Sequence, residues 1–124
     1  MRQVIADFDG VRLTLDLGAT PTADAVWAAL PFDGDVLTWG EEVYFGVPVS
    51  VAREADARDV VRPGEIAFWT DGQAIAIGFG KTPISRGDET RLAAPCNIWA
   101  TTVDDVRSLS RVASGTRVSL RRAG

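Results

Sequence analysis

The chain has 124 residues, a formal net charge of −4, 46% hydrophobic and 24% charged residues. This composition is typical of one soluble globular domain, and we expect a single domain over residues 1–124. The negative charge argues against nucleic-acid binding, which needs clustered basic side chains, and the apolar runs are too short for a membrane span.

Residues that the chain lacks narrow the chemistry further. There is no histidine, which excludes Ser-His and Cys-His mechanisms and metal ligation by histidine. No loop has the acidic spacing of a calcium site, so we expect no metal and no cofactor. Cys96 is the only cysteine, and we expect a buried, inert thiol. The N-terminal residues lack the apolar stretch of a signal peptide, which favours a cytoplasmic protein.

The first third of the chain predicts a hairpin and a helix. Residues 3–8 and 11–17 alternate apolar and polar side chains around Asp9-Gly10, a dipeptide suited to the positive φ of a type I′ turn. Thr20 before Pro21 is typical of a helix start, and we expect the helix to end before Pro31. Trp27 on this helix is expected in the core.

The middle of the chain predicts strands separated by turns. Gly40 interrupts one strand-like stretch and indicates a bulge or a bend. Alternating valines with Pro48 among them indicate an edge strand, and residues 53–62 have the polar character of a surface loop. The expected strands are 36–39, 41–45, 47–51, 66–69 and 74–79, and the last two form a second hairpin whose Ile75, Ile77 and Phe79 face inward.

The last third predicts a loop, a strand, a short helix and a final strand. Residues 82–94 are expected to be a loop and 97–101 a strand. Thr102 can cap a helix that starts at Val103 and ends before Gly115. Residues 116–120 then form the last strand, with a disordered end at 121–124. About eight short strands with two short helices favour a closed antiparallel barrel.

Four segments with this spacing give the chain a family resemblance. They are residues 38–45 (Thr-Trp-Gly-Glu-Glu-Val-Tyr-Phe), 63–69 with Pro-Gly-Glu and Phe-Trp, 79–83 (Phe-Gly-Lys-Thr-Pro) and Asn97-Ile98. With them the chain resembles the small bacterial and archaeal cyclophilin-like domain of unknown function. The resemblance implies a mainly β fold, a closed eight-stranded antiparallel cyclophilin-like barrel with two short helices.

Cyclophilins proper are peptidyl-prolyl isomerases, and their motifs differ from this sequence. Their activity depends on an arginine in a Phe-His-Arg type strand, an apolar proline pocket and an Asn-Gly-Ser-Gln-Phe-Phe type segment, none of which we find here. The barrier to X-Pro rotation is about 20 kcal/mol, and lowering it takes a well-placed donor. An isomerase on this chain would need a newly built site.

The candidate site centres on the strand at 41–45. Adjacent Glu41 and Glu42 point to opposite faces of a regular strand. If Val43 and Phe45 face the barrel, Glu42 and Tyr44 share the outer face, where the resemblance places a groove. Glu41 then points inward unless Gly40 carries a bulge. Glu42 is then either a hydrogen-bond acceptor or general base, or a solvated strand residue.

The tryptophans and the only lysine complete the candidate site. Trp39 and Trp69 either wall a small pocket or pack in the core. Lys81 either binds an anion or neutralises a neighbouring glutamate. Asn97 either donates to a ligand or closes a turn.

We therefore expect a binding domain that takes a small molecule or a short peptide in an outer groove, without established catalysis. The expected lining is Trp39, Glu42, Tyr44, Trp69, Phe79 and Lys81. Two alternatives stay open. One is a peptidyl-prolyl isomerase with an atypical site, and the other is an enzyme acting on a small acidic or amide substrate, with Glu42 as base and Lys81 as anion holder.

Overall fold

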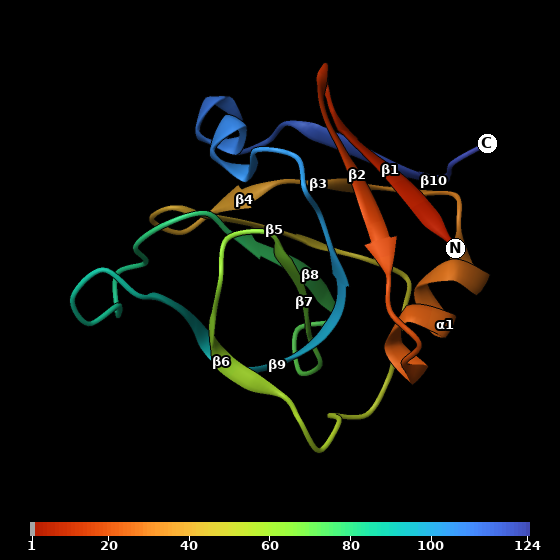
Figure 1. Ribbon diagram of the computed structural model, residues 1–124. Helices are drawn as coiled ribbons and strands as arrows, with labels where there is room; N and C mark the ends of the chain where they lie inside the picture. Colours follow the sequence, from red (N-terminus) through yellow and green to blue (C-terminus); the bar gives the residue numbers. More distant parts are fainter. Residues whose placement is uncertain (1) are drawn as a thin grey trace.

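The computed structural model describes residues 2–124, most of which form a curled antiparallel β-sheet (Figure 1). The elements in chain order are β1 (Gln3–Phe8), β2 (Val11–Leu17), α1 (Pro21–Ala29), β3 (Phe32–Asp35), β4 (Leu37–Thr38), β5 (Glu42–Gly46), β6 (Arg58–Val61), β7 (Glu65–Trp69), β8 (Ala74–Gly78), β9 (Thr90–Thr101), the 3-10 helix η1 (Val106–Arg111) and β10 (Arg117–Arg122).

The sheet curls into a nearly closed barrel. Its strand order is β3-β10-β1-β2-β9-β7-β8-β5-β4, and β6 pairs with β9 off this path. The end strands β3 and β4 follow one another in the chain, separated only by Val36. Gly34 of β3 also lies against β5, where a Cβ atom would sit 3.1 Å from the carbonyl oxygen of Gly46. The predicted mainly β antiparallel barrel with two helices is confirmed, with a strand count close to the expected eight.

The barrel interior holds the main hydrophobic core. Phe8 of β1 and Phe45 of β5 meet edge to face across it, with ring centroids 5.9 Å apart. Helix α1 packs against β9 and begins as predicted, because the Thr20 side chain accepts a hydrogen bond from the Ala23 N–H at 3.1 Å. Trp27 packs half-buried at the core margin, and the Arg122 guanidinium lies 4.5 Å from its ring centre.

Both predicted hairpins form. β1 and β2 pair around Asp9 (φ 55°) and Gly10 (φ 104°), the two positive φ angles that a type I′ turn requires. β7 and β8 pair around residues 70–73. Ile75, Ile77 and Phe79 are buried in the barrel core, as the alternation predicts.

Between residues 47 and 94, three segments differ from the prediction. The alternating valines at 47–51 form no strand: Val47 and Val49 are buried, and Pro48 between them has no N–H to donate. β6 lies within the segment 53–62, which was expected to be a loop. β9 begins at Thr90, within the segment 82–94, which was also expected to be a loop. These two strands pair with each other.

Two segments near the end of the chain also differ from the prediction. η1 begins at Val106 rather than Val103, because Asp105 and not Thr102 caps it: the Asp105 carboxylate accepts from the Arg107 N–H. The first two residues of the expected disordered end at 121–124 are strand instead, since Arg121 and Arg122 pair with Ile5 and Val4 of β1.

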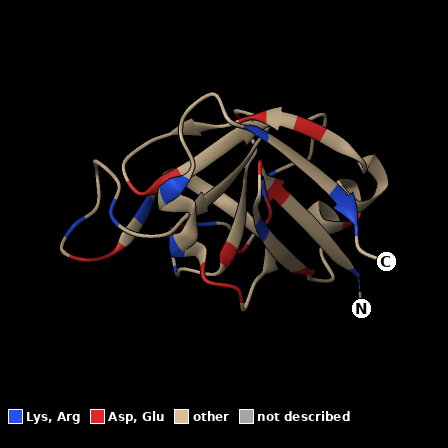
Figure 2. Ribbon diagram, turned by 90° about the horizontal axis from the view of Figure 1, so that it is seen from above, with Lys and Arg blue, Asp and Glu red and all other residues tan. Residues whose placement is uncertain are grey.

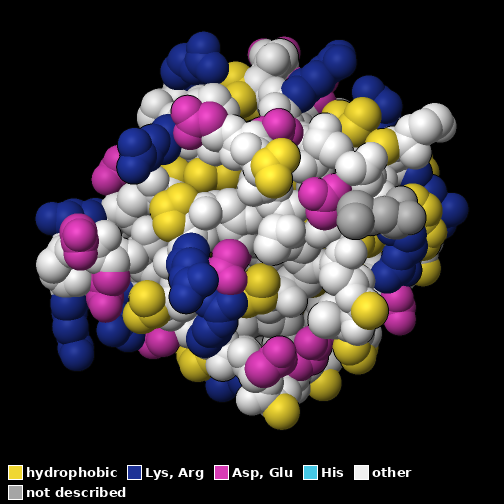
Figure 3. All heavy atoms as spheres, in the orientation of Figure 1, with side chains coloured by type: hydrophobic (Ala, Val, Ile, Leu, Met, Phe, Trp, Pro, Cys, Tyr) yellow, Lys and Arg dark blue, Asp and Glu magenta, His cyan; other side chains and the backbone are white. Residues whose placement is uncertain are grey.

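Charged residues of both signs are interspersed along the strands and loops (Figure 2) and over the face seen in Figure 3. Within residues 2–124, neither helix has the length and apolar character that crossing a membrane would require.

Candidate functional site

The outer faces of β5 and β8 form the floor of a pocket. In this pair Glu42 lies opposite Gly78 and Tyr44 opposite Ala76. β8 reads Ala-Ile-Ala-Ile-Gly, and its two isoleucines are buried in the barrel core. Because side chains alternate along a strand, the small residues of β8 face outward. A hollow therefore forms on the outside of the barrel.

A two-stranded ribbon of β6 and the first half of β9 walls this hollow. The last residues of β9 pair with β7, whereas its first residues pair with β6, which lies away from β1, β2 and β10 in Figure 1. The ribbon packs over β8, since a Cβ atom on Gly78 would sit 2.4 Å from Cγ2 of Thr90. A second hydrophobic cluster fills this layer, formed by Val61, Ala67, Ala76, Leu92 and Cys96.

The pocket has a volume of about 140 Å³ and a mostly apolar lining. Its lining residues are Trp39, Glu42, Tyr44, Trp69, Ala76, Leu92, Ala93, Ala94 and Cys96. Four of the residues singled out from the sequence are thus brought together: Trp39, Glu42, Tyr44 and Trp69. The three aromatic side chains remain partly exposed at the pocket, whereas Glu42 is only 5% exposed.

Phe79 and Lys81 do not line this pocket. Phe79 is buried in the barrel core. Lys81 is exposed, and its main chain pairs with Glu41: the Lys81 N–H donates to Oε1 of Glu41 at 3.1 Å, and the Glu41 N–H donates to the Lys81 carbonyl at 2.7 Å. Glu42 faces the pocket, as the strand alternation predicts. The same alternation would turn Glu41 inward, but Glu41 is exposed, because it precedes β5 and follows Gly40, whose φ is +61°.

Five lining residues were not predicted to belong to the site: Ala76, Leu92, Ala93, Ala94 and Cys96. The alternation of small and large residues along β8 was a usable signal for Ala76, because small outward residues leave space that a ligand can fill. Leu92 to Ala94 carry no local signal of this kind. Their place depends on the pairing of β9 with β6, distant in the sequence.

Glu42 is the polar feature of the pocket. Its Oε1 is buried and has no hydrogen-bond partner among residues 2–124. Burial disfavours the charged form and raises the pKa of Glu42 from 4.5 to about 7, with no other cause acting on it. At neutral pH this carboxyl group therefore gains or loses a proton readily, inside an apolar surrounding.

Cys96 lies in the same pocket as a neutral thiol. Its Sγ donates to the carbonyl of Ala94 at 3.3 Å. Burial, and then the negative charge of Glu42, raise the pKa of the thiol from 9.0 to about 12. Since the thiolate is the nucleophile, Cys96 supplies apolar lining at neutral pH rather than covalent chemistry.

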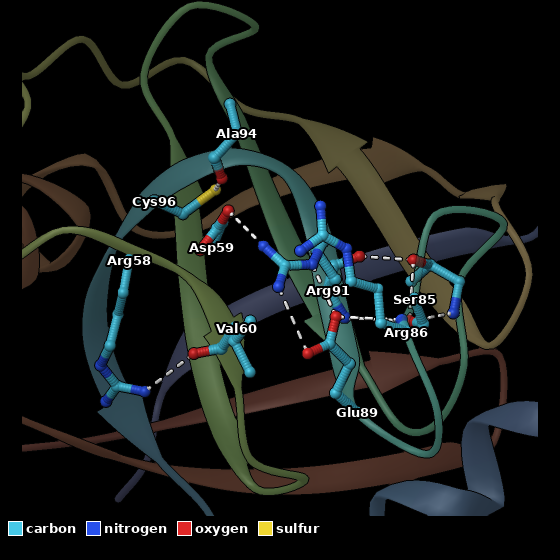
Figure 4. Close-up of polar contacts among 10 residues, drawn as sticks. Arg58, Asp59, Val60, Ser85, Arg86, Glu89, Arg91, Ala94 and Cys96 are labelled. Atoms are coloured by element: carbon cyan, nitrogen blue, oxygen red, sulfur yellow. Dashed lines mark hydrogen bonds and ion pairs between the residues drawn. The ribbon is translucent and has the colours of Figure 1, made fainter.

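Arg91 fixes the wall that carries Leu92, Ala93 and Ala94 (Figure 4). Its Nη1 donates to Oδ2 of Asp59 on β6 at 2.8 Å, and its Nε donates to Oε2 of Glu89 at 2.6 Å. The Arg91 N–H also donates to the hydroxyl of Ser85 at 3.1 Å. These contacts join β6, β9 and the loop before β9, so the pocket wall has a defined position.

Asn97 lies outside the pocket, in a buried network that supports the fold. Its Oδ1 accepts from the Glu54 N–H at 2.8 Å, and its Nδ2 donates to the Thr22 hydroxyl at 2.9 Å and the Ala52 carbonyl at 3.0 Å. Asn97 thereby joins β9 to α1 and to the segment after β5. Both N–H groups of the Asn97 side chain and its Oδ1 thus have partners within the protein.

Comparison with known proteins identifies the family. The family model described as Cyclophilin-like matches residues 2–121. The chain is similar to the solution structure of the hypothetical protein AF2241 from Archaeoglobus fulgidus, with 34% identity, a TM-score of 0.84, and 98% of this chain and 95% of that chain covered. No curated protein matches this chain.

A second solved structure, McbB in complex with tryptophan, shares the fold. It is 19% identical with a TM-score of 0.68, and the match covers 100% of this chain and 45% of that chain. This chain thus spans less than half the length of McbB, and identity at this level shows the fold alone. The family match over residues 2–121 and the resemblance to the archaeal protein agree: the chain belongs to the cyclophilin-like family.

Proposed function

We propose that this domain binds a small molecule in the outer pocket, with Glu42 as the hydrogen-bond acceptor and Trp39, Tyr44 and Trp69 as apolar walls. The observation that carries the proposal is the buried Oε1 of Glu42, which has no partner among residues 2–124. Pockets that bind small molecules typically combine an apolar lining with a few placed polar groups, and this pocket has that composition.

The energetics of Glu42 support a binding role. A buried carboxylate oxygen without a partner loses its hydration and gains nothing in exchange, at a cost of about 1–3 kcal/mol or more. Glutamine or leucine at this position would avoid the charge. A ligand that donates a hydrogen bond to Oε1 would recover the lost interaction.

The size of the pocket limits the ligand. An engineered apolar cavity of about 150 Å³ binds benzene, and the volume here is about 140 Å³. The pocket therefore suits a molecule with one ring or one branched apolar group, and a short peptide would enter it by a single side chain. McbB, part of which shares this fold, has a structure in complex with tryptophan, which is in line with binding of a small molecule.

The two enzymatic alternatives receive less support from the pocket. None of its nine lining residues is an arginine, the donor on which cyclophilin isomerases depend, and Lys81 is not among them. Exchange spectroscopy on an Ala-Pro peptide tests the isomerase directly. Accelerated cis/trans exchange at catalytic protein concentrations would revive that alternative.

The test of binding uses the four tryptophans as reporters. We would screen small fragments that carry one ring and a hydrogen-bond donor, and follow the indole N–H signals in 15N-labelled protein. Ligands in this pocket should shift the signals of Trp39 and Trp69. Trp27 on α1 and the fully buried Trp99 lie outside the pocket and are internal controls.

Two variants make the assignment specific. Glu42→Gln should weaken binding of the hits, because its neutral amide oxygen is a weaker hydrogen-bond acceptor than a carboxylate while the side-chain shape is kept. Glu41→Gln is the matched control, since its exposed amide can still accept from the Lys81 N–H. A screen whose hits move Trp27 or Trp99 and leave Trp39 and Trp69 unchanged would contradict the proposal.

A further inference from the structure

The charge balance of the pocket indicates the class of ligand. We propose, on the basis of the function proposed above, that the pocket selects an organic ammonium ion, whose N–H donates to Oε1 of Glu42 while an apolar body of one ring or one branched group lies against Trp39 and Trp69.

The first support is that no group among residues 2–124 compensates the charge of Glu42. Of the nine lining residues in the described part of the chain, none is a lysine or an arginine. Desolvation alone accounts for the raised pKa of Glu42, so no neighbouring cation or hydrogen bond stabilises its ionised form. In proteins, buried charges are normally paired. A cationic ligand would supply the missing partner, whereas a neutral ligand would leave the charge unbalanced.

The groups around Glu42 do not change this conclusion. From β9 it faces the thiol of Cys96, which the raised pKa keeps neutral, and from β5 it has the phenol of Tyr44 beside it. The charges that act on Cys96 from outside the lining are Arg53, which lowers its pKa, and Asp59, which raises it. Asp59 is already paired with Arg91. Glu42 thus remains the only charged residue of the lining.

The second support is the aromatic lining. Three of the nine lining residues are Trp39, Tyr44 and Trp69. The negative face of an aromatic ring attracts cations, most strongly for tryptophan, and aromatic cages of this composition recognise ammonium groups. The three rings come from different parts of the sheet: Trp69 ends β7, Trp39 follows β4 and Tyr44 lies within β5. An ammonium group next to Glu42 would therefore meet a carboxylate and aromatic rings in one small site.

An ammonium ligand also has a thermodynamic signature. It prefers ionised Glu42, so its binding releases a proton wherever Glu42 is protonated in the free protein. Below the pKa of Glu42, which burial raises to about 7, the affinity should fall by up to about tenfold for each pH unit. A neutral alcohol binds with a much smaller pH dependence, because it can pair with either form of the carboxyl group.

The experiment compares matched ligands that differ only in charge. We would titrate benzylammonium against benzyl alcohol, and isobutylammonium against isobutanol, following the indole signals of Trp39 and Trp69. At about pH 8 each ammonium should bind at least about tenfold more tightly than its alcohol. Between about pH 7 and pH 5 the affinity of the ammonium should fall by about tenfold per pH unit.

The variants separate the charge from the shape of the pocket. In Glu42→Gln the affinity of the ammonium should drop to that of the alcohol, and its pH dependence should disappear. Glu41→Gln should retain the wild-type preference. If Glu42→Gln fails to fold, the pH dependence in the wild-type protein still decides, because Glu42 is the only lining group with an acidic pKa raised towards neutrality.

The outcomes distinguish the two proposals. Ammonium selectivity at Trp39 and Trp69 with the pH dependence above supports both. Alcohols that bind there as tightly as the ammonium ions overturn the ligand class and leave the pocket as a small-molecule site. If the fragment screen also yields no ligand at Trp39 and Trp69, the proposed function fails and the ligand class fails with it.

Discussion

Replacing Glu42 by glutamine should stabilise the protein increasingly as the pH rises from about 4.5 to about 7. Burial raises the pKa of Glu42 from its ordinary value of 4.5 to about 7. The folded state therefore holds a proton that the unfolded state has released between these values, and the free energy of unfolding falls as the pH rises through this interval. Glu42→Gln removes the titrating group, so the variant should not show this fall in the free energy of unfolding.

The size of the effect follows from the two pKa values. Each pH unit between the folded and unfolded pKa corresponds to about 1.4 kcal/mol. The interval from 4.5 to about 7 thus corresponds to a stability difference of about 3 kcal/mol between Glu42→Gln and the wild-type protein above pH 7. Near pH 4.5 the difference should be close to zero, because protonated glutamic acid and glutamine are both neutral and of similar shape.

The assay is urea denaturation followed by tryptophan fluorescence between about pH 4.5 and pH 8.5. Carboxyl groups with lowered pKa values, such as Asp7 with its hydrogen bond from the Gly10 N–H and Glu65 beside Arg58, change stability in the opposite direction. Their effects cancel when the variant is compared with the wild type at each pH. Glu41→Gln controls for the loss of one negative charge. A stability difference that stays constant over this pH range would refute the reasoning.

Three further predictions concern other residues. Alkylation of Cys96 by iodoacetamide near pH 8 should be at least about a hundredfold slower in the folded protein than in urea, because its pKa rises from 9.0 to about 12; comparable rates would contradict this. Asn97→Ala should lower the free energy of unfolding by about 2–4 kcal/mol in urea, since it leaves the Glu54 N–H and the Ala52 carbonyl without their partner. Gly40→Ala should lower the free energy of unfolding in urea by about 1–3 kcal/mol, because the φ of Gly40 is +61° and an added Cβ would lie 2.8 Å from the Lys81 carbonyl oxygen. Gly46→Ala is the control, because an added Cβ there would have nothing within 4 Å, and its free energy of unfolding should change much less.

Local patterns predicted the parts of the fold whose partners are close in sequence. The Asp9-Gly10 turn joins β1 and β2, which are neighbours in the sequence. The Thr20 side chain caps the helix by a hydrogen bond from Ala23, only three residues further on. β6 was missed because its sequence, Arg-Asp-Val-Val, has little alternation. Its stability comes instead from distant partners, namely the pairing with β9 and the ion pair from Asp59 to Arg91.

The end of the chain shows the same limit. Arg121 and Arg122 have the composition of a frayed terminus, but they complete the ladder with β1. Arg122 also donates to the carbonyl of Trp27 at 2.9 Å and covers its ring. No local pattern reports a contact across 95 residues.

The candidate pocket was partly predictable for a related reason. Strand alternation is local, and it correctly placed Glu42 and Tyr44 on the outer face. The same alternation puts Phe79 inward, in the core, and therefore away from an outer groove. The place of Lys81 depends on how the chain leaves β8, where its main chain is bound by Glu41.

Glu42 affects both the stability of the fold and the proposed binding of a ligand. On β5 the inward residues Val43 and Phe45 hold the barrel core, and the outward Glu42 weakens the fold as it ionises. A ligand that binds only the folded state raises its stability, and an ammonium ligand does so most where Glu42 is ionised. Saturating benzylammonium should therefore reduce the fall in stability between about pH 4.5 and pH 7, whereas benzyl alcohol should raise stability nearly evenly across that range. The charge that weakens the fold as Glu42 ionises would thus also be the source of selectivity for a bound ammonium ion.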